Sequence, residues 1–236
     1  AGAGKISPGD TVHLCGNVIN GLIFQASGSS GNPVTLLFES GGKMSKATWG
    51  GGSAITQVGG TLSWLIVDGG ANGLIEDTNN GSSPTYPTAN NDSGVYFPGC
   101  NNCIVRNLLV QNLFVKNTTD AQGTSDAIHL VGDAGSLYSN TVHDADFCVT
   151  YNYAVSATET NGAIYQNTIY HCNGGIVVGD TGDNAIFNGL LIHDNTIHDF
   201  SNWDDLGTNT FHHDPIHVFV TNLHSEITGL QVYNNY

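Results

Sequence analysis

The sequence predicts an all-β chain in which short strands stack on one another in successive turns of a coil. Two observations lead to this fold class. The 236 residues include 31 Gly and 26 Asn but few Lys, Arg, Glu or Met, so residues typical of turns and strands outnumber those that favour helices. A motif of the form apolar-x-x-Asn-x-apolar also returns at spacings of 33, 27, 28 and 40 residues. Turns with a common core and loops of variable length give such spacings.

An Asn anchors every copy of this motif. The five copies are centred on Asn107, Asn140, Asn167, Asn195 and Asn235. When strands stack ~4.8 Å apart, side-chain amides at one position can bond to the layer above and the layer below. Asn also tolerates the left-handed backbone of a tight turn. We therefore expect an Asn ladder at one corner of the coil.

Each repeat is expected to hold three short strands, which in one repeat are residues 127–130, 136–139 and 141–144. The alternation of period two points one residue of each first strand inward and its successor outward. The expected inward residues are Val95, Ile128, Cys148, Ile176 and Ile216, and the expected outward column is Tyr96, His129, Val149, Val177 and His217. Two more outward columns are expected, one with Val105, Tyr138, Tyr165, His193 and Tyr233, the other with Val110, His143, Tyr170 and His198.

With this Asn ladder, the opening residues 7–14 (Ser-Pro-Gly-Asp-Thr-Val-His-Leu) and the segment 26–35, the chain resembles the right-handed parallel β-helix of the pectate lyase-like superfamily. The resemblance covers nearly the whole chain. It implies one parallel β-helix domain over residues 1–236, with three short strands per coil. It specifies a scaffold and not a reaction. The competing architectures are a β-propeller, with repeats of ~40–45 residues, and a β-sandwich, which lacks a fixed Asn corner.

The last copy of the repeat stops one residue into its third strand, at Tyr236. An open coil end exposes unpaired strand edges. We therefore expect that the polypeptide continues past this point or that another chain covers the end, which includes end-to-end self-association. A self-contained cap formed by residues 220–236 would contradict this expectation.

The charge is unevenly distributed along the chain. The first 116 residues carry all five cations and six acids, whereas the remaining 120 carry 14 acids, no Lys or Arg, and nine of the ten His. Such a surface repels phosphate backbones and anionic membranes, so a nucleic-acid partner and a membrane partner are excluded. No run of 18 apolar residues is present either.

The five cysteines leave at least one thiol without a partner inside the chain. The pair Cys100 and Cys103 is spaced for a small disulfide loop. A zinc site would need a second ligand pair, and none has matching spacing. The sequence does not decide whether this pair forms a disulfide or stays as two free thiols.

A candidate site comes from two matching segments, Asp126-Ala-Ile-His129 and Asp214-Pro-Ile-His217. They are similar to the Asp-Gly-Ile motif at the active faces of β-helix glycosidases, with Gly replaced by Ala and Pro. Asp146 is expected to fill the equivalent Asp position between them. The two His are three layers apart, roughly 14 Å, so they cannot form one acid/base pair by themselves.

The longest repeat carries an insertion, residues 201–214, that is rich in Asp and His. Trp203 could stack on a sugar, and two of its carboxylates could serve hydrolysis if they lie ~5–5.5 Å or ~6.5–9.5 Å apart. Three interpretations stay open: a carbohydrate site, a metal site, and a solvated loop whose polar side chains cap turns. The metal site would use His212, His213 and His217, or it would hold Ca²⁺ on Asp204, Asp205 and Asp214. The candidate catalytic residues are Asp126, His129, Asp204, Asp205, Asp214 and His217, and the candidate substrate-binding residues are Tyr96, Trp203, His212 and His213.

These residues favour a secreted, carbohydrate-associated protein that hydrolyses a neutral or weakly charged polysaccharide. A Ca²⁺-assisted lyase is an alternative, with Arg106 as its base, but pairing of Arg106 with a nearby acid fits better. The ring columns are interpreted either as sugar-binding ladders or as stacks that stabilise the coil. The remaining alternative is a non-catalytic extracellular structural protein such as a filament subunit or an adhesin.

Overall fold

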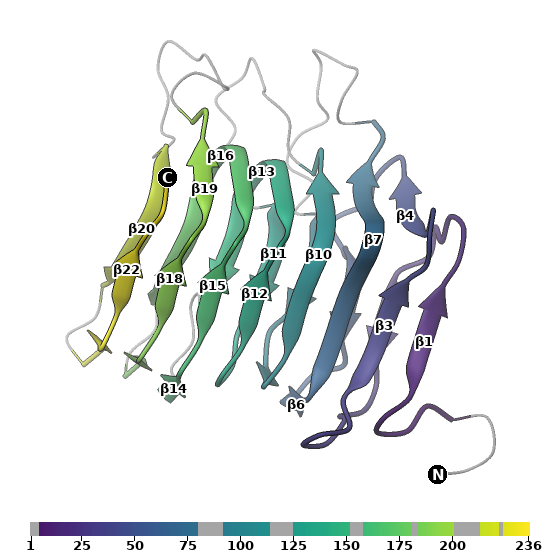
Figure 1. Cartoon of the computed structure of the whole chain (residues 1–236), viewed down its shortest axis with the longest axis horizontal. Coiled ribbons are helices and arrows are strands. Elements are labelled where there is room, and N and C mark those ends of the chain that lie inside the picture. Colours follow the sequence, from purple (N-terminus) through teal and green to yellow (C-terminus); the bar gives the residue numbers. More distant parts are fainter. Residues whose placement is uncertain are drawn as a thin grey trace.

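The computed structural model describes residues 5–79, 92–113, 125–151, 158–180, 184–200, 213–221 and 224–236. These residues form strands and no helix, so the chain is all-β as predicted (Figure 1). Seventeen strands join one hydrogen-bonded sheet in which all the pairings between strands are parallel. The described residues contain no helix that could span a membrane.

The strands of this sheet lie in three rows that run along the stack (Figure 1). Row 1 contains β1 (Thr11–Leu14), β3 (Val34–Phe38), the start of β7 (Leu65–Asp77), the start of β10 (Ile104–Gln111), β12 (Ser136–Tyr138), β15 (Ala163–Tyr165), β18 (Leu191–His193) and β22 (Gln231–Tyr233). Row 2 contains β4 (Lys43–Lys46), the ends of β7 and β10, the start of β13 (Thr141–Tyr151), the start of β16 (Thr168–Asp180) and β19 (Thr196–His198). Row 3 contains β2 (Leu22–Phe24), β5 (Ser53–Gln57), β8 (Ser93–Phe97), β11 (Asp126–Leu130), the ends of β13 and β16, and β20 (Asp214–Val220).

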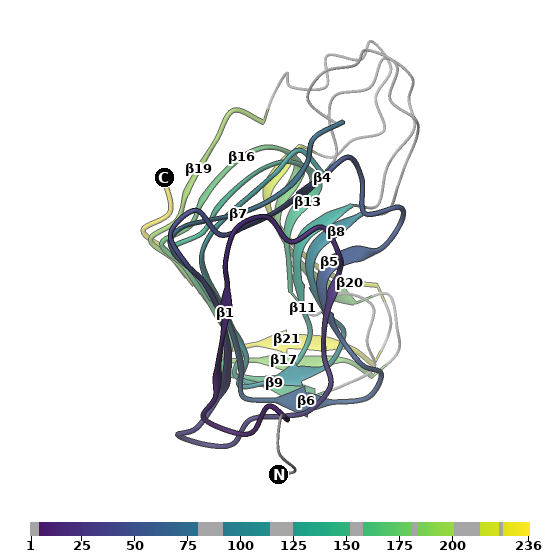
Figure 2. The same ribbon diagram turned by 90° about the vertical axis from the view of Figure 1, so that its right-hand side faces the viewer.

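In the described residues, five shorter strands lie outside the large sheet and form two small sheets. They are β6 (Leu62–Ser63) with β9 (Cys100–Asn101), and β14 (Thr158–Thr160) with β17 (Ile186–Asn188) and β21 (Glu226–Thr228). In the view turned by 90° the rows and these short strands surround a common interior (Figure 2). We call one circuit through the rows a layer.

The predicted strand positions are confirmed to within a residue, with one difference in how they connect. The strand expected at 141–144 does not end there but continues to Tyr151 as one strand, β13. The same continuation occurs in β16. These strands pass from row 2 into row 3, because the residues at the bend stay paired with the neighbouring layer.

The inward residues of row 3 form an apolar column, and the structure corrects one of its members. Ile128 is paired with Val149, which is paired with Ile176, and all three are fully buried. The expected inward residue Cys148 therefore stands one position before the column, and Val149, expected to point outward, belongs to it. The run Phe147-Cys148-Val149 is apolar throughout, so its alternation does not specify the phase.

Two disulfides lie inside the stack. Cys100 is bonded to Cys103, which decides between the two interpretations of that pair. Cys148 is bonded to Cys172 in the next layer, and all four of these cysteines are buried. The one remaining cysteine, Cys15, is exposed and unpaired.

The Asn ladder is present, and it starts one layer later than expected. Its members are Asn140, Asn167, Asn195 and Asn235. In each step the Oδ1 atom of one Asn accepts hydrogen bonds from the backbone N–H and the Nδ2 of the Asn in the preceding layer, at 2.9–3.2 Å. Each Nδ2 also donates to a backbone carbonyl one layer back, such as that of Leu137 for Asn167.

Asn107 is not part of this ladder. The N–H of Leu108 occupies its place and donates to Asn140 Oδ1, while Asn107 Nδ2 donates to Asp68. Asn107 matches the residue before each ladder Asn, and those residues carry the left-handed backbone with φ between +52° and +57°. They are Asn107, Ser139, Gln166, Asp194 and Asn234. The turn and the ladder therefore use adjacent positions and not the same one.

We predict that Asn167→Ala lowers the free energy of unfolding by about 2–4 kcal/mol, because the buried N–H of Asn140 and the carbonyl of Leu137, both in the preceding layer, lose their hydrogen bonds to its side chain. Asn107→Gly serves as the control, since Gly accepts the positive φ and only the bond to Asp68 is lost. Its cost is expected to stay below about 1 kcal/mol in the same urea titration. Equal costs for the two variants would contradict the ladder as described.

Candidate functional site

The candidate site lies on the outward side of row 3. The pairing of its strands places Tyr96 beside His129, His129 beside Thr150, Thr150 beside Val177, and Val177 beside His217. Thr150 thus replaces Val149 in the expected column. Three successive members of this column, His129, Thr150 and Val177, are almost fully buried although they point away from the common interior.

A hydrogen-bonded network joins three residues at the centre of this face. The carboxylate of Asp126, at the start of β11, receives the Nδ1 hydrogen of His129 at 2.9 Å. Its other oxygen accepts a hydrogen bond from Thr150 Oγ1, one layer further on, at 2.8 Å. The ring of Tyr96 packs edge-on against the His129 ring, with centroids 4.9 Å apart. The imidazole is therefore held by the Asp126 carboxylate and the Tyr96 ring, and Thr150 in turn holds that carboxylate.

This arrangement sets the chemistry of His129. An ionised carboxylate only accepts hydrogen bonds, so Nδ1 carries the hydrogen, and in the neutral form of the ring the lone pair is on Nε2. An imidazole oriented in this way is a proton acceptor of the kind used in general base catalysis. The network also explains the placement of Asp126, whose two oxygens both have partners.

A second Asp–His pair occupies the same face in β20. His217 Nδ1 lies 3.3 Å from Asp214 Oδ2, and the side chains are 30% and 41% exposed. This pair is more open than the first one, whose His and Asp side chains are 7% and 17% exposed. Three layer steps separate the two pairs, or about 14 Å. Asp126 and Asp214 are thus too far apart to be the two carboxylates of a glycosidase, which needs at most ~9.5 Å.

Asp146 was expected to align with Asp126 and Asp214, and this is wrong. The strand pairing puts Phe147 and Gly174 at that position, whereas Asp146 lies one residue earlier. There it is buried and accepts a hydrogen bond from Asn173 Nδ2 at 2.8 Å. Burial raises the pKa of Asp146 to about 7; the bond from Asn173 opposes this, and the charge of Asp126 adds to it.

Asp146 belongs to a polar column that sequence reasoning missed. From the layer of β8 onward the column precedes row 3 by one residue, and its described members are Asp92, Ser125, Asp146, Asn173 and His213. Within this column the N–H of Asp146 donates to Ser125 Oγ, and the N–H of His213 donates to Asn173 Oδ1. The signal in the sequence is a polar residue directly before each row 3 segment from β8 onward.

The first member of this column, Asp92, forms a buried carboxyl pair with Asp77. Asp92 is fully buried and accepts hydrogen bonds from Thr48 Oγ1 and from the N–H groups of Trp49 and Gly51. Asp77 is also fully buried. Burial, the hydrogen bond with Asp92 and the charge of Asp92 raise the pKa of Asp77 to about 9. Asp77 is therefore protonated at neutral pH and shares its hydrogen with the Asp92 carboxylate.

A third buried acid, Glu159, lies apart from row 3. It is paired with Phe187 and, through it, with Ile227 in the inward column of β14, β17 and β21. Glu159 is 5% exposed, and burial raises its pKa to about 7. Its two neighbours in the strand are Thr, so no apolar alternation marks the position in the sequence.

The ring columns predicted for rows 1 and 2 are present, but their starting residues differ. Arg106 and Gln111, and not Val105 and Val110, are in register with the rings. The centroids of successive rings are 4.4–5.1 Å apart and the planes are within 13° of parallel. The two columns are Tyr138, Tyr165, His193 and Tyr233, and His143, Tyr170 and His198.

This geometry decides between the two interpretations of the columns. Each ring inside a column has its faces against the neighbouring rings, so a sugar cannot lie on them and meets only ring edges. Stacking between layers is thus the role that the geometry supports.

Arg106, the alternative lyase base, is tied to other residues of row 1. Its guanidinium bonds to Asp68 at 2.7–2.8 Å and to the hydroxyl of Tyr138 at 2.8 Å. Burial alone would raise the pKa of Asp68, but the hydrogen bonds from Asn107, Gly70 and Arg106 outweigh it and lower that pKa. The ion pair expected from the sequence is confirmed.

Four candidate residues, Trp203, Asp204, Asp205 and His212, lie outside the described residues. Within the described ranges, no three His, Cys, Asp or Glu side chains gather in a way that would hold a metal ion. No protein-family model, curated protein or solved structure matches this chain. Its function is therefore inferred from its own residues.

We predict that Asp77→Asn stabilises the protein increasingly as the pH rises. The pKa of Asp77 is higher in the folded protein than its ordinary value of 3.8, so its contribution to stability is full below about pH 4 and is lost as the pH rises toward 9. An amide keeps the hydrogen bond to Asp92 without this loss. The melting temperature should exceed that of the parent by at least about 2 °C at pH 8 and match it near pH 4.

Glu76→Gln is the control for this measurement. Glu76 is adjacent in sequence, but its oxygens accept hydrogen bonds from Ser45 and Gln111 at the surface of row 2. This variant should show no gain that grows with pH. A loss of stability of Asp77→Asn that is equal at both pH values would contradict the shared hydrogen.

Proposed function

We propose that this chain is a right-handed parallel β-helix of the pectate lyase-like kind, and that it binds and hydrolyses a neutral or weakly charged polysaccharide along row 3. The parallel stack in three rows and the ladder of Asn140, Asn167, Asn195 and Asn235 support the architecture. The observation that carries the function is the pair of Asp–His dyads on one face of the stack, at Asp126–His129 and Asp214–His217.

The two dyads have different roles in this proposal. His217 is the more exposed imidazole, so it contacts the substrate and accepts the proton from the attacking water. Asp214 fixes its orientation. The tighter Asp126–His129–Thr150 network lies three layers away; it is almost buried and supports the ring of Tyr96, which provides a binding position further along the same polysaccharide. The predicted proton donor is Asp204 or Asp205, and Trp203 and His212 remain predicted sugar contacts.

Charge and chemistry favour hydrolysis over elimination. A lyase needs a base and a cation that neutralises the uronate carboxylate. Arg106, the one cation within the repeated Asn motif itself, is paired with Asp68 in row 1 and not on row 3. With a formal charge of −15, the chain also repels polyanionic sugars. Ca²⁺ on Asp204, Asp205 and Asp214 remains the route by which the lyase alternative would operate.

Secretion is part of the proposal. Both disulfides are buried in the stack, and such bonds form and persist in oxidising compartments. A non-catalytic extracellular structural protein is the second candidate, and the ring columns favour it, because their rings serve the stack itself.

We predict that Asp214→Asn and His217→Ala each reduce hydrolysis by at least about 100-fold, measured as reducing-sugar release from a panel of neutral and acidic polysaccharides. Both side chains are partly exposed, so the variants should keep the parent's melting temperature. The matched control is His198→Ala. His198 also pairs with an Asp, at 2.7 Å from Asp199, but it belongs to the row 2 ring column.

If both row 3 variants keep full activity, Asp214 and His217 do not form the active site. Absence of hydrolysis by the parent protein on the whole panel, with polysaccharide binding also absent, would favour the structural alternative. Formation of unsaturated products in the presence of Ca²⁺ would favour the lyase.

A further inference from the structure

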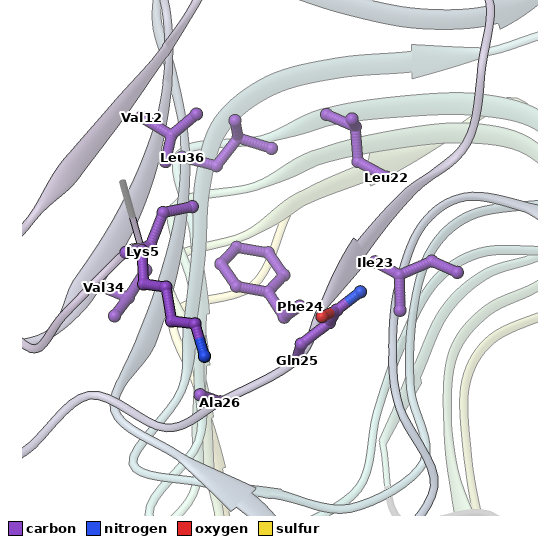
Figure 3. A pocket seen from close by; sticks show the side chains of 10 residues that line it. Lys5, Val12, Leu22, Ile23, Phe24, Gln25, Ala26, Val34 and Leu36 are labelled. Atoms are coloured by element: carbon purple, nitrogen blue, oxygen red, sulfur yellow. The ribbon is translucent and has the colours of Figure 1, made fainter. Parts of the chain in front are cut away.

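The common interior of the stack is lined mainly by apolar side chains. At the first layers Val12, Leu22, Phe24 and Leu36 line a cavity of about 610 Å³ (Figure 3). Glu159 is an exception further along the stack, because it belongs to the inward column of the short strands on one side of this interior (Figure 2). Since a charge inside such an interior is costly, the protonation of this acid bears on how that side of the stack is held.

The other members of this column are apolar or lack a side chain. Backbone hydrogen bonds place Gly132 between Cys100 and Glu159 in successive layers. The column therefore consists of Leu62, Cys100, Gly132, Glu159, Phe187 and Ile227. Gly132 contributes no side chain there, and its N–H donates a hydrogen bond to the Glu159 carboxyl.

One oxygen of this carboxyl has no hydrogen-bond partner. Glu159 is 5% exposed, and its Oε2 atom is buried without a donor or an acceptor. No Lys or Arg follows Lys116 in the sequence, so the layer of Glu159 and all later layers hold no such cation to pair with it. A charge at this position would be neither solvated nor neutralised, which costs far more than burying the neutral acid.

Among the described residues, the elements packed around Glu159 offer no cation. The segment before β12 contributes Asp133, and β13 contributes Tyr151, whose hydroxyl donates to the Gly132 carbonyl. β17 and the interior side of row 1 contribute apolar side chains, such as that of Phe187. Burial raises the pKa of Glu159 to about 7; the hydrogen bond from Gly132 opposes this shift, and the charge of Asp133 adds to it.

The strand that carries Glu159 is short enough to move as a unit. β14 has three residues, of which Thr158 is exposed. At its end, the N–H of Ala134 donates to the Thr160 carbonyl, and the N–H of Asn161 donates to the Asn188 carbonyl. These bonds must break before the carboxyl reaches water. The strands β13 and β15 have their own pairing with neighbouring layers and stay in place.

We propose that Glu159 is a pH-dependent switch: when its carboxyl ionises, β14 is released from Gly132 and from β17, and this side of the stack opens while the three rows remain paired. This inference does not depend on the proposed hydrolysis.

Proton linkage sets the pH range of the switch. The pKa of Glu159 is about 7 in the closed form, whereas the open form has the ordinary value of 4.5. The closed form is therefore favoured most at acidic pH and loses ground as the pH rises from 4.5 toward 7. Above pH 7 both forms are ionised, so the balance changes little.

The test is hydrogen–deuterium exchange of the Ala134 and Asn161 amides, resolved by NMR in the 236-residue protein from pH 5 to pH 8.5. After correction for the intrinsic rate, their protection should fall about 40-fold from pH 5 to pH 7 and less than about threefold from there to pH 8.5. Both should also be at least about tenfold less protected than the Asn140 amide, because the ladder bond from Asn140 to Asn167 stays closed.

Glu159→Gln is the decisive variant, because an amide accepts the same hydrogen bond from Gly132 and does not ionise. Its protection at Ala134 and Asn161 should stay within about threefold between pH 5 and pH 7. The matched control is Glu226→Gln. Glu226 is exposed in β21 of the same small sheet, so this variant should follow the parent.

Three results would overturn the proposal. The first is protection of the parent at these two amides that does not change with pH. The second is a Glu159→Gln variant that keeps the pH dependence of the parent. The third is equal protection of Ala134, Asn161 and Asn140 at every pH, because β14 would then open only when the whole stack unfolds.

Discussion

The register between neighbouring layers is the constraint on which the rest of this structure depends, and from β10 onward the ladder of Asn140, Asn167, Asn195 and Asn235 imposes it. One amide oxygen receives both a backbone and a side-chain hydrogen from the layer before it. Both hydrogen bonds keep good geometry at only one spacing between the layers and one alignment of their strands. Since Asn140 lies between β12 and β13, fixing it also fixes the strands of rows 1 and 2 on both sides.

Every column of side chains follows from that register. Rings meet rings, as in Tyr165 and His193, and apolar residues meet apolar residues, as in Ile128 and Val149. The same rule places polar residues on polar residues inside the stack. Asp146 and Asn173 satisfy each other in this way. Where two acids meet instead, as at Asp77 and Asp92, one of them keeps its proton.

Local patterns in the sequence predict the strands and most of the columns. The features that they do not predict depend on how one layer aligns with the next. Asp126 and His129 are three residues apart in one strand, so their pairing follows from the segment itself. The contact of Asp126 with Thr150 depends on whether Cys148 or Val149 faces Ile128, and an apolar run leaves that phase open. Asn107 was assigned to the ladder because its motif has the right residues, yet the ladder position is one further on. The Asp77–Asp92 pair joins residues from different rows, for which the sequence holds no periodic signal.

The disulfide between Cys148 and Cys172 limits how the number of layers can change during evolution. Elsewhere neighbouring layers are joined by equivalent hydrogen bonds, such as those of the Asn ladder. One layer, for example residues 141–167, can therefore be duplicated or deleted in the gene, because the layers on either side of it still find equivalent hydrogen-bond partners. The covalent link removes that freedom at one place, because losing either layer leaves an unpaired cysteine in the interior and removes the cross-link. Changes in the length of this protein by whole layers are therefore expected outside the β13–β16 pair, which stays as the fixed segment between two adjustable ends.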